Sequence, residues 1–172
     1  MIDTKLKNKI VLVTGVNNPY GIGAATAKAF ASEGATVFAS YLRLPTEEST
    51  TNIPGEIFYR AQNAKTADEV IVAIRERGGK IEAWEADLAD PAVIPQLFDQ
   101  AERAFGPVDI LINNAAHCDP DTFIPQSQLG SNSRAVDKFP ISTITADKHD
   151  RHFAVNSRAA ALMMAEFARR HF

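Results

Sequence analysis

The chain has 172 residues, 45% of them hydrophobic, which is enough for one compact domain with its own core. Lys and Arg number 18 against 21 Asp and Glu and are dispersed, so the sequence lacks the basic stripe typical of nucleic-acid-binding proteins, and we expect a small-molecule partner. The polar segment 1–9 and the short apolar run behind it resemble neither a signal peptide nor a membrane span. The single cysteine, Cys118, excludes an internal disulfide. We therefore expect one cytoplasmic domain over residues 1–172, with no membrane partner.

Apolar runs bounded by turn residues alternate with helical patterns along the chain. The runs predict four buried strands at residues 10–13, 36–39, 81–85 and 108–112. The helical patterns cover residues 23–32, 67–77 and 92–105, and each ends next to a glycine. This alternation predicts a doubly wound α/β fold, Rossmann-like, with helices on both faces of a parallel sheet. The stretches 42–65 and 117–145 are predicted as long loops, and a last helix is expected from Ala146 onward.

A glycine-rich segment directly follows the first predicted strand and reads Thr14-Gly15-Val16-Asn17-Asn18-Pro19-Tyr20-Gly21-Ile22-Gly23. Glycines between a strand and a helix let the backbone approach a pyrophosphate, and the helix N-terminus favours its negative charge. The G-x5-G-x-G spacing also occurs in ordinary tight turns, so the segment alone leaves both interpretations open. A methyltransferase would need an acidic residue at the end of the second strand, where Ser40 and Tyr41 stand.

Three further segments follow in chain order: Asp87-Leu88 after the third strand, Asn113-Asn114-Ala115-Ala116 after the fourth, and Phe153-Ala154-Val155-Asn156 in the last helix. Together with the glycine segment they resemble the N-terminal Rossmann portion of the short-chain dehydrogenase/reductase family, in a ketoreductase-like form. The resemblance covers essentially the whole chain. It implies an NAD(P)(H)-dependent oxidoreductase that transfers hydride between a carbonyl and an alcohol, and that assembles as a homo-oligomer.

The resemblance also implies roles for individual residues. Asp87 would accept a hydrogen bond from the adenine amino group, or be a turn or capping aspartate. Asn113 and the residues behind it would let the nicotinamide ribose pass close to the backbone, or would simply end the strand. Asn156, the catalytic candidate, would hold a water in a proton relay and kink its helix, or be structural. Asp109 is expected to orient the Asn113 turn. The expected cofactor-binding residues are Gly15, Asn17, Tyr20, Gly21, Ile22, Gly23, Tyr41, Arg43, Asp87, Leu88, Asn113 and Ala115.

The sequence departs from the family pattern around the cofactor. The glycine segment is two residues longer than the usual T-G-x3-G-x-G, which widens the loop over the phosphates. Tyr41 stands where NAD-preferring members place an aspartate, and Arg43 follows two residues later. Because a guanidinium pairs with phosphate in a bidentate manner, we expect NADP over NAD. The alternative is that Arg43 is a solvated loop residue.

The catalytic serine and the Tyr-x3-Lys pair of the family would follow Phe172 and do not occur in this sequence. We therefore expect the chain alone to be inactive, either as a piece of a protein of about 250 residues or as a chain completed by a partner. A strand order of 3-2-1-4 would leave the fourth strand as an exposed edge. The alternatives to an enzyme are a noncatalytic dinucleotide-binding or assembly module, or an inactive fragment.

A His/Cys/Asp cluster and an apolar helical segment are two further candidates for functional sites in the sequence. A metal site at His117, Cys118, Asp119 and Asp121 is not expected, because no second spaced His/Cys pair accompanies the cluster. Residues 159–167 carry small and apolar side chains at helical spacing and should be mostly core. In the resembling family this helix packs in a subunit interface, so Met163, Met164 and Phe167 are expected to face another protomer in part.

Overall fold

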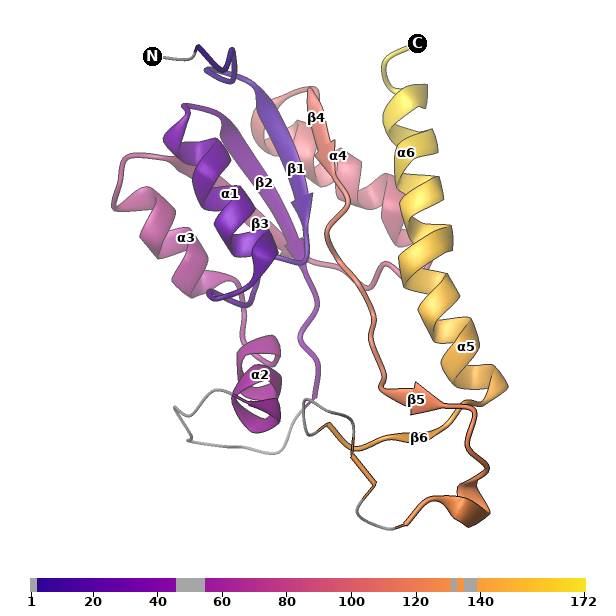
Figure 1. Ribbon diagram of the computed structural model, residues 1–172. Helices are drawn as coiled ribbons and strands as arrows, with labels where there is room; N and C mark the ends of the chain where they lie inside the picture. Colours follow the sequence, from indigo (N-terminus) through magenta and orange to yellow (C-terminus); the bar gives the residue numbers. More distant parts are fainter. Residues whose placement is uncertain (1–2, 46–54, 131–132, 135–138) are drawn as a thin grey trace.

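A four-stranded parallel sheet forms the centre of the molecule (Figure 1). The computed structural model describes residues 3–45, 55–130, 133–134 and 139–172. The strands lie in the order β3-β2-β1-β4, which confirms the doubly wound α/β class and the predicted order. Within the described chain β3 and β4 are the edge strands, and β4 pairs with β1. Their bounds are β1 (Ile10–Thr14), β2 (Thr36–Tyr41), β3 (Lys80–Glu85) and β4 (Ile110–Ile112).

Helices cover both faces of this sheet (Figure 1). On one face lie α1 (Ile22–Ser32) and α3 (Asp68–Arg75), and on the other α4 (Val93–Phe105) and α6 (Ala160–Arg169). Because successive side chains of a strand point to opposite faces, Val11 and Val13 pack toward α1 and α3, whereas Leu12 packs toward α4 and α6. All three are fully buried, so β1 anchors both halves of the core.

The last helical segment changes its winding midway. It begins with α5 (Ala146–Phe153), whose cap Thr145 accepts a hydrogen bond from the Lys148 N–H, and continues through the π-helical segment η2 (Ala154–Ala159) into α6. The π-helical turns include Asn156, where the resemblance implied a kink. Met163 is fully buried within the chain, so the prediction that it faces another protomer is wrong. Phe167 packs against Phe98 and is only partly buried, so for this residue the partial interface contact stays a prediction. Met164 is exposed.

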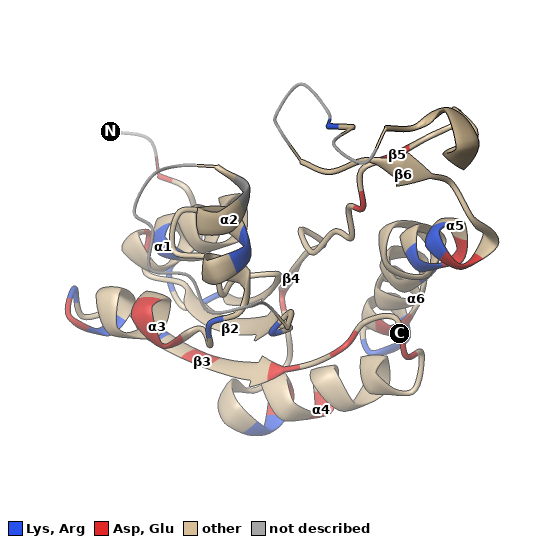
Figure 2. Ribbon diagram, turned by 90° about the horizontal axis from the view of Figure 1, so that it is seen from below, with Lys and Arg blue, Asp and Glu red and all other residues tan. Residues whose placement is uncertain are grey.

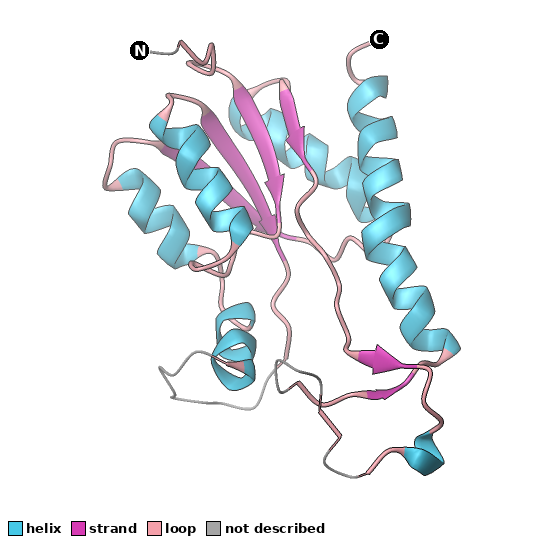
Figure 3. Ribbon diagram, viewed as in Figure 1, coloured by secondary structure: helices cyan, strands magenta, loops and turns pink. Residues whose placement is uncertain are grey.

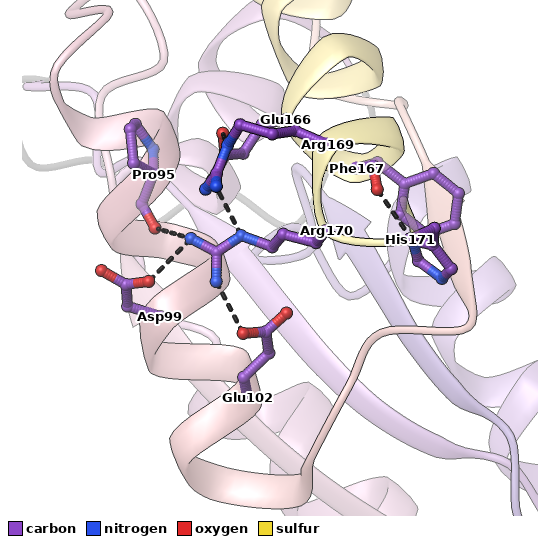
Figure 4. A network of polar contacts seen from close by, with 8 residues as sticks. All are labelled: Pro95, Asp99, Glu102, Glu166, Phe167, Arg169, Arg170 and His171. Atoms are coloured by element: carbon purple, nitrogen blue, oxygen red, sulfur yellow. Dashed lines mark hydrogen bonds and ion pairs between the residues drawn. The ribbon is translucent and has the colours of Figure 1, made fainter.

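Arg170, directly after α6, binds residues of α4 and so connects the two helices (Figure 4). Its guanidinium bonds three carboxylates, at 2.7 Å to Asp99, 2.6 Å to Glu102 and 2.8 Å to Glu166, and also the Pro95 carbonyl. The same group lies 5.3 Å from the centre of the Phe98 ring. Since the Arg170 side chain is only 13% exposed, these partners replace most of its hydration.

The two stretches predicted as long loops contain short elements (Figure 3). Within 42–65 lies α2 (Glu56–Asn63), and within 117–145 lie β5 (Asp121–Thr122), η1 (Gln126–Gln128) and β6 (Ser142–Thr143). The prediction that these stretches are loops is therefore wrong for the residues of these elements, whereas residues 46–54, 131–132 and 135–138 lie outside the described chain. The side-chain N–H groups of Asn17 hold α2 in place by donating to the carbonyls of Leu42, Asn63 and Lys65.

Lys, Arg, Asp and Glu residues are distributed over the described elements (Figure 2). None of the helices in the described residues is long and apolar enough to cross a membrane.

Candidate nucleotide-binding site

The glycine segment makes a sharp turn between β1 and α1. Gly15 has a φ of +74°, in the left-handed region that favours glycine, and its N–H donates to the Ser40 carbonyl at 2.8 Å. A Cβ atom on Gly15 would lie 2.9 Å from Cα of Ala115. A Cβ atom on Gly23 would lie 2.1 Å from the Gly15 carbonyl oxygen. Both positions therefore require glycine, because Gly15 lies against the backbone that leaves β4 and Gly23 lies against the backbone that leaves β1.

Thr14 and Asn114 join this turn to the end of β4. The Thr14 hydroxyl oxygen accepts from the N–H groups of Asn114 and Ala115 at 3.0 and 2.9 Å. In return, the Asn114 side chain donates to the carbonyls of Thr14 and Gly15 at 2.8 and 3.1 Å. Sequence reasoning gave neither residue a role of its own. The sequence offered one indication of this contact: a polar residue stands at the end of β1 and another directly after β4, and these two strands are neighbours in the sheet.

The N-terminus of α1 is open. Its cap is Gly21, which offers no side-chain acceptor, and the first turn holds no acidic residue. The Gly21 N–H is used by the Asn18 carbonyl, whereas the first N–H groups of any α-helix have no partner within the helix. These N–H groups and the helix dipole together attract an anion.

A cavity of about 600 Å³ lies at the carboxyl edge of the sheet, in front of this helix end. Most of the expected cofactor-binding residues line it. Arg43, Asn113 and Asn156 do not, although their neighbours Leu42, Asn114 and Val155 do. The expected residues in the cavity wall are Gly15, Asn17, Tyr20, Gly21, Ile22, Gly23, Tyr41, Asp87, Leu88 and Ala115.

Aromatic residues of α2 form a part of the cavity wall that the sequence did not reveal. Phe58 and Tyr59 both line the cavity. The Phe58 ring lies 5.3 Å from that of Tyr20, and the Tyr59 ring 5.9 Å from that of Phe139. Because α2 lies in a stretch predicted to be a loop, its contribution was missed.

Several polar residues around the cavity already have protein partners. The Asp87 carboxylate accepts from the Ala89 N–H at 2.9 Å, so this residue shapes a turn as well as lining the cavity. The Tyr41 side chain is partly buried, and this desolvation raises the pKa of its hydroxyl, with the negative charge of Glu85 adding to the effect. Arg43 forms a bidentate ion pair with Glu85, with Nε and Nη2 within 2.9 Å of the carboxylate oxygens.

Asn156 holds the main chain that leaves β4. Its side-chain oxygen accepts from the His117 N–H, and its side-chain nitrogen donates to the His117 carbonyl. His152, one turn earlier, accepts from the Asp119 N–H at Nε2 while its Nδ1 faces the Lys148 carbonyl. In this arrangement Nε2 accepts and Nδ1 donates, which ties the His152 ring to both α5 and the segment after β4.

Asp109 does not orient the Asn113 turn, contrary to expectation. It lies before β4, at the amino end of the sheet, and accepts from the Ile10 N–H at 2.8 Å and from Lys9 at 2.7 Å. Within the described residues, no group of three or more His, Cys, Asp or Glu side chains is arranged to hold a metal ion.

Comparison with known proteins agrees with this geometry. The family model described as short chain dehydrogenase matches residues 54–171. The chain belongs to this family. The oxidoreductase YxbG of Bacillus subtilis is 36% identical over 158 residues, an alignment that covers 92% of this chain and 44% of that protein. The NADPH-dependent aldehyde reductase 2 of Arabidopsis thaliana is 32% identical over 168 residues, 96% of this chain and 51% of the relative.

Solved structures show the same relationship. A short chain dehydrogenase from Burkholderia cenocepacia, in complex with NADP, has 30% identity and a TM-score of 0.64. The alignment covers 96% of this chain and 52% of that one. The family's fold is therefore shared over nearly the whole chain, which spans about half the length of the curated relatives it matches.

Proposed function

We propose that residues 1–172 form the dinucleotide-binding domain of an NAD(P)(H)-dependent oxidoreductase that interconverts a carbonyl and an alcohol. The observation that carries the proposal is the glycine turn packed against the open N-terminus of α1, at the wall of a cavity large enough for a nucleotide. The relative named as NADPH-dependent and the neighbour in complex with NADP support a nicotinamide dinucleotide, NADP or NAD, as the cofactor.

The residues of the cavity fit this group in a definite order. Gly21, Ile22 and Gly23 would hold the pyrophosphate at the helix N-terminus, with Gly15, Asn17 and Tyr20 forming the loop around it. Tyr41, Asp87 and Leu88, at the ends of β2 and β3, would surround the adenosine, with Arg43 beside them outside the cavity wall. Asn113 and Ala115, at the end of β4, would lie along the nicotinamide ribose. The bound nicotinamide supplies or accepts the hydride.

The proposed part of Asn156 in the chemistry is positional. By holding both main-chain groups of His117, it fixes the segment that borders the substrate end of the cavity. The proton relay that the family resemblance implies would be a second role of Asn156. The family's serine, tyrosine and lysine would complete the site in the whole protein. Homo-oligomer formation and a cytoplasmic location stay predictions.

Calorimetric titration of this chain with NADPH and with NADH tests the proposal. We expect saturable binding of at least one nucleotide, and a loss of binding in Gly23→Ala, whose new Cβ would collide with the Gly15 carbonyl. A folded chain that binds neither nucleotide would contradict the proposal. Reduction of simple ketones by this chain alone would instead contradict the expectation that it is inactive by itself.

A further inference from the structure

The ion pair between Arg43 and Glu85 is set by the sheet register. Glu85 is the last residue of β3 and stands opposite Tyr41, the last residue of β2. Arg43 follows two residues later, and its main-chain N–H also donates to the Glu85 carboxylate, at 3.2 Å. One carboxylate therefore engages the backbone and the side chain of Arg43 together. These hydrogen bonds lower the pKa of Glu85, so the carboxylate stays charged at neutral pH.

Glu85 occupies the guanidinium of Arg43, the group that would bind the 2′-phosphate of NADP. Side-on bidentate binding of an oxyanion by arginine uses Nε and one Nη, and in Arg43 these atoms, Nε and Nη2, already bond Glu85. Tyr41 and Leu42 line the cavity, whereas Arg43 and Glu85 are absent from the described wall. The guanidinium is thus held outside the space in which the proposed adenosine would lie.

We infer that Glu85 determines the specificity of the nucleotide site, by withholding Arg43 from the 2′-phosphate of NADP. The inference rests on the proposed function. A 2′-phosphorylated adenosine must displace the Glu85 carboxylate from Arg43 and is also repelled by it. An adenosine with a free 2′-hydroxyl meets neither obstacle. Glu85 therefore lowers the affinity for NADPH relative to that for NADH, compared with a site in which Arg43 were free to bind the phosphate.

Glu85→Gln tests this, with Glu82→Gln as the matched control. Glu82 is an exposed residue on the same strand, so its replacement removes the same charge away from Arg43. We expect Glu85→Gln to tighten NADPH binding about two- to fivefold, the upper part of the range of an exposed ion pair, and to leave NADH binding nearly unchanged. Glu82→Gln should change neither affinity by more than about twofold. In Arg43→Gln, the further change Glu85→Gln should give a smaller gain, because only the repulsion between Glu85 and the phosphate is then removed.

Each contrary outcome has a distinct meaning. Weaker NADPH binding in Glu85→Gln would show that Glu85 presents Arg43 to the phosphate, and equal changes for both nucleotides would show a general charge effect. Either result overturns the inference. Glu85→Asp, whose shorter side chain cannot keep all of these bonds, should give an intermediate gain and serves if the glutamine variant does not fold. A folded wild-type chain that binds neither nucleotide would instead contradict the proposed function.

Discussion

The carboxamide of Asn156 binds both main-chain groups of His117, with 2.8 Å to the N–H and 2.9 Å to the carbonyl oxygen. This pairing joins the π-helical segment to the chain that leaves β4, 39 residues earlier. It resembles the hydrogen bonding of two paired strands, made here by a single side chain.

Asn156→Ala removes both bonds and should lower the free energy of unfolding by about 1 kcal/mol, since the site is open to water. Asn156→Asp should be more destabilising at neutral pH, because a carboxylate oxygen would face the His117 carbonyl. Below about pH 4 that carboxylate protonates, can donate again, and the aspartate variant should approach the wild type. Denaturant unfolding at several pH values measures this, with Ser157→Ala as the control. A pH-independent difference between Asp and Asn would contradict the assignment.

Thr14→Val keeps the shape of the side chain and removes the oxygen that accepts from Asn114 and Ala115. Thr14 is 1% exposed, so water cannot replace the lost acceptor, and we expect a destabilisation of about 2–3 kcal/mol. Thr14→Ser retains the hydroxyl and should cost less than about 1 kcal/mol. Thermal or urea unfolding compares the two variants, and equal stabilities would show that the hydroxyl is not needed.

Gly23→Ala would place a Cβ atom 2.1 Å from a main-chain oxygen that cannot move without opening the turn. We expect a loss of at least about 3 kcal/mol of stability, at the upper end of overpacking costs, together with the loss of nucleotide binding. Gly130→Ala is the matched control, because the nearest atom to its new Cβ would be 3.9 Å away. If both variants unfold at the same temperature, the close packing described for Gly23 is incorrect.

The acid sensitivity of the fold should depend on Glu166. Hydrogen bonds from Arg169, and from Arg170, lower its pKa from 4.5 to about 2 against an opposing effect of burial. A carboxyl group whose pKa is lower in the folded state stabilises the fold above its unfolded pKa and loses this contribution as the pH falls through the folded value. The stabilisation should therefore be complete above about pH 4.5 and gone near pH 2.

Glu166→Gln should remove this part of the pH dependence. Melting temperatures of wild type and variant, measured from pH 7 to pH 2, should differ most at neutral pH and converge on acidification. A difference that grows toward acid pH would contradict the role assigned to Glu166.

The sheet and most of its helices could be predicted from the sequence because their signals are local. Apolar β-branched residues mark the strands, and glycines mark helix ends, as at Gly34 and Gly106. The glycine turn could also be predicted, since the need for glycine at Gly15 and Gly23 arises within a short stretch of sequence between a strand and a helix. The family resemblance added Asn156, whose partner His117 no local pattern could identify.

What escaped prediction depends on contacts between distant residues. The helix α2 has only eight residues, and its placement relies on Asn17, which binds carbonyls up to 48 residues away. The pairing of Arg43 with Glu85, 42 residues apart, follows from the register of β2 and β3, which the sequence does not state. Asp109 was misplaced because it precedes β4, whereas Asn113 follows that strand. The two residues therefore lie at opposite ends of β4, and Asp109 instead binds Ile10 at the start of β1.

The position of β1 bears on the synthesis of the protein. This strand is made before the other three strands of the sheet and lies between two of them. The residues that cover one of its edges come about a hundred positions later, as the pairing of Val11 with Ile110 shows. At ordinary rates of translation that interval is roughly 5–20 s. During it, β1 can pair with β2 while the main-chain N–H and C=O groups of its other edge stay unpaired on the ribosome. The nascent chain thus passes through a period of aggregation risk at β1, which ends for this strand when β4 pairs with it.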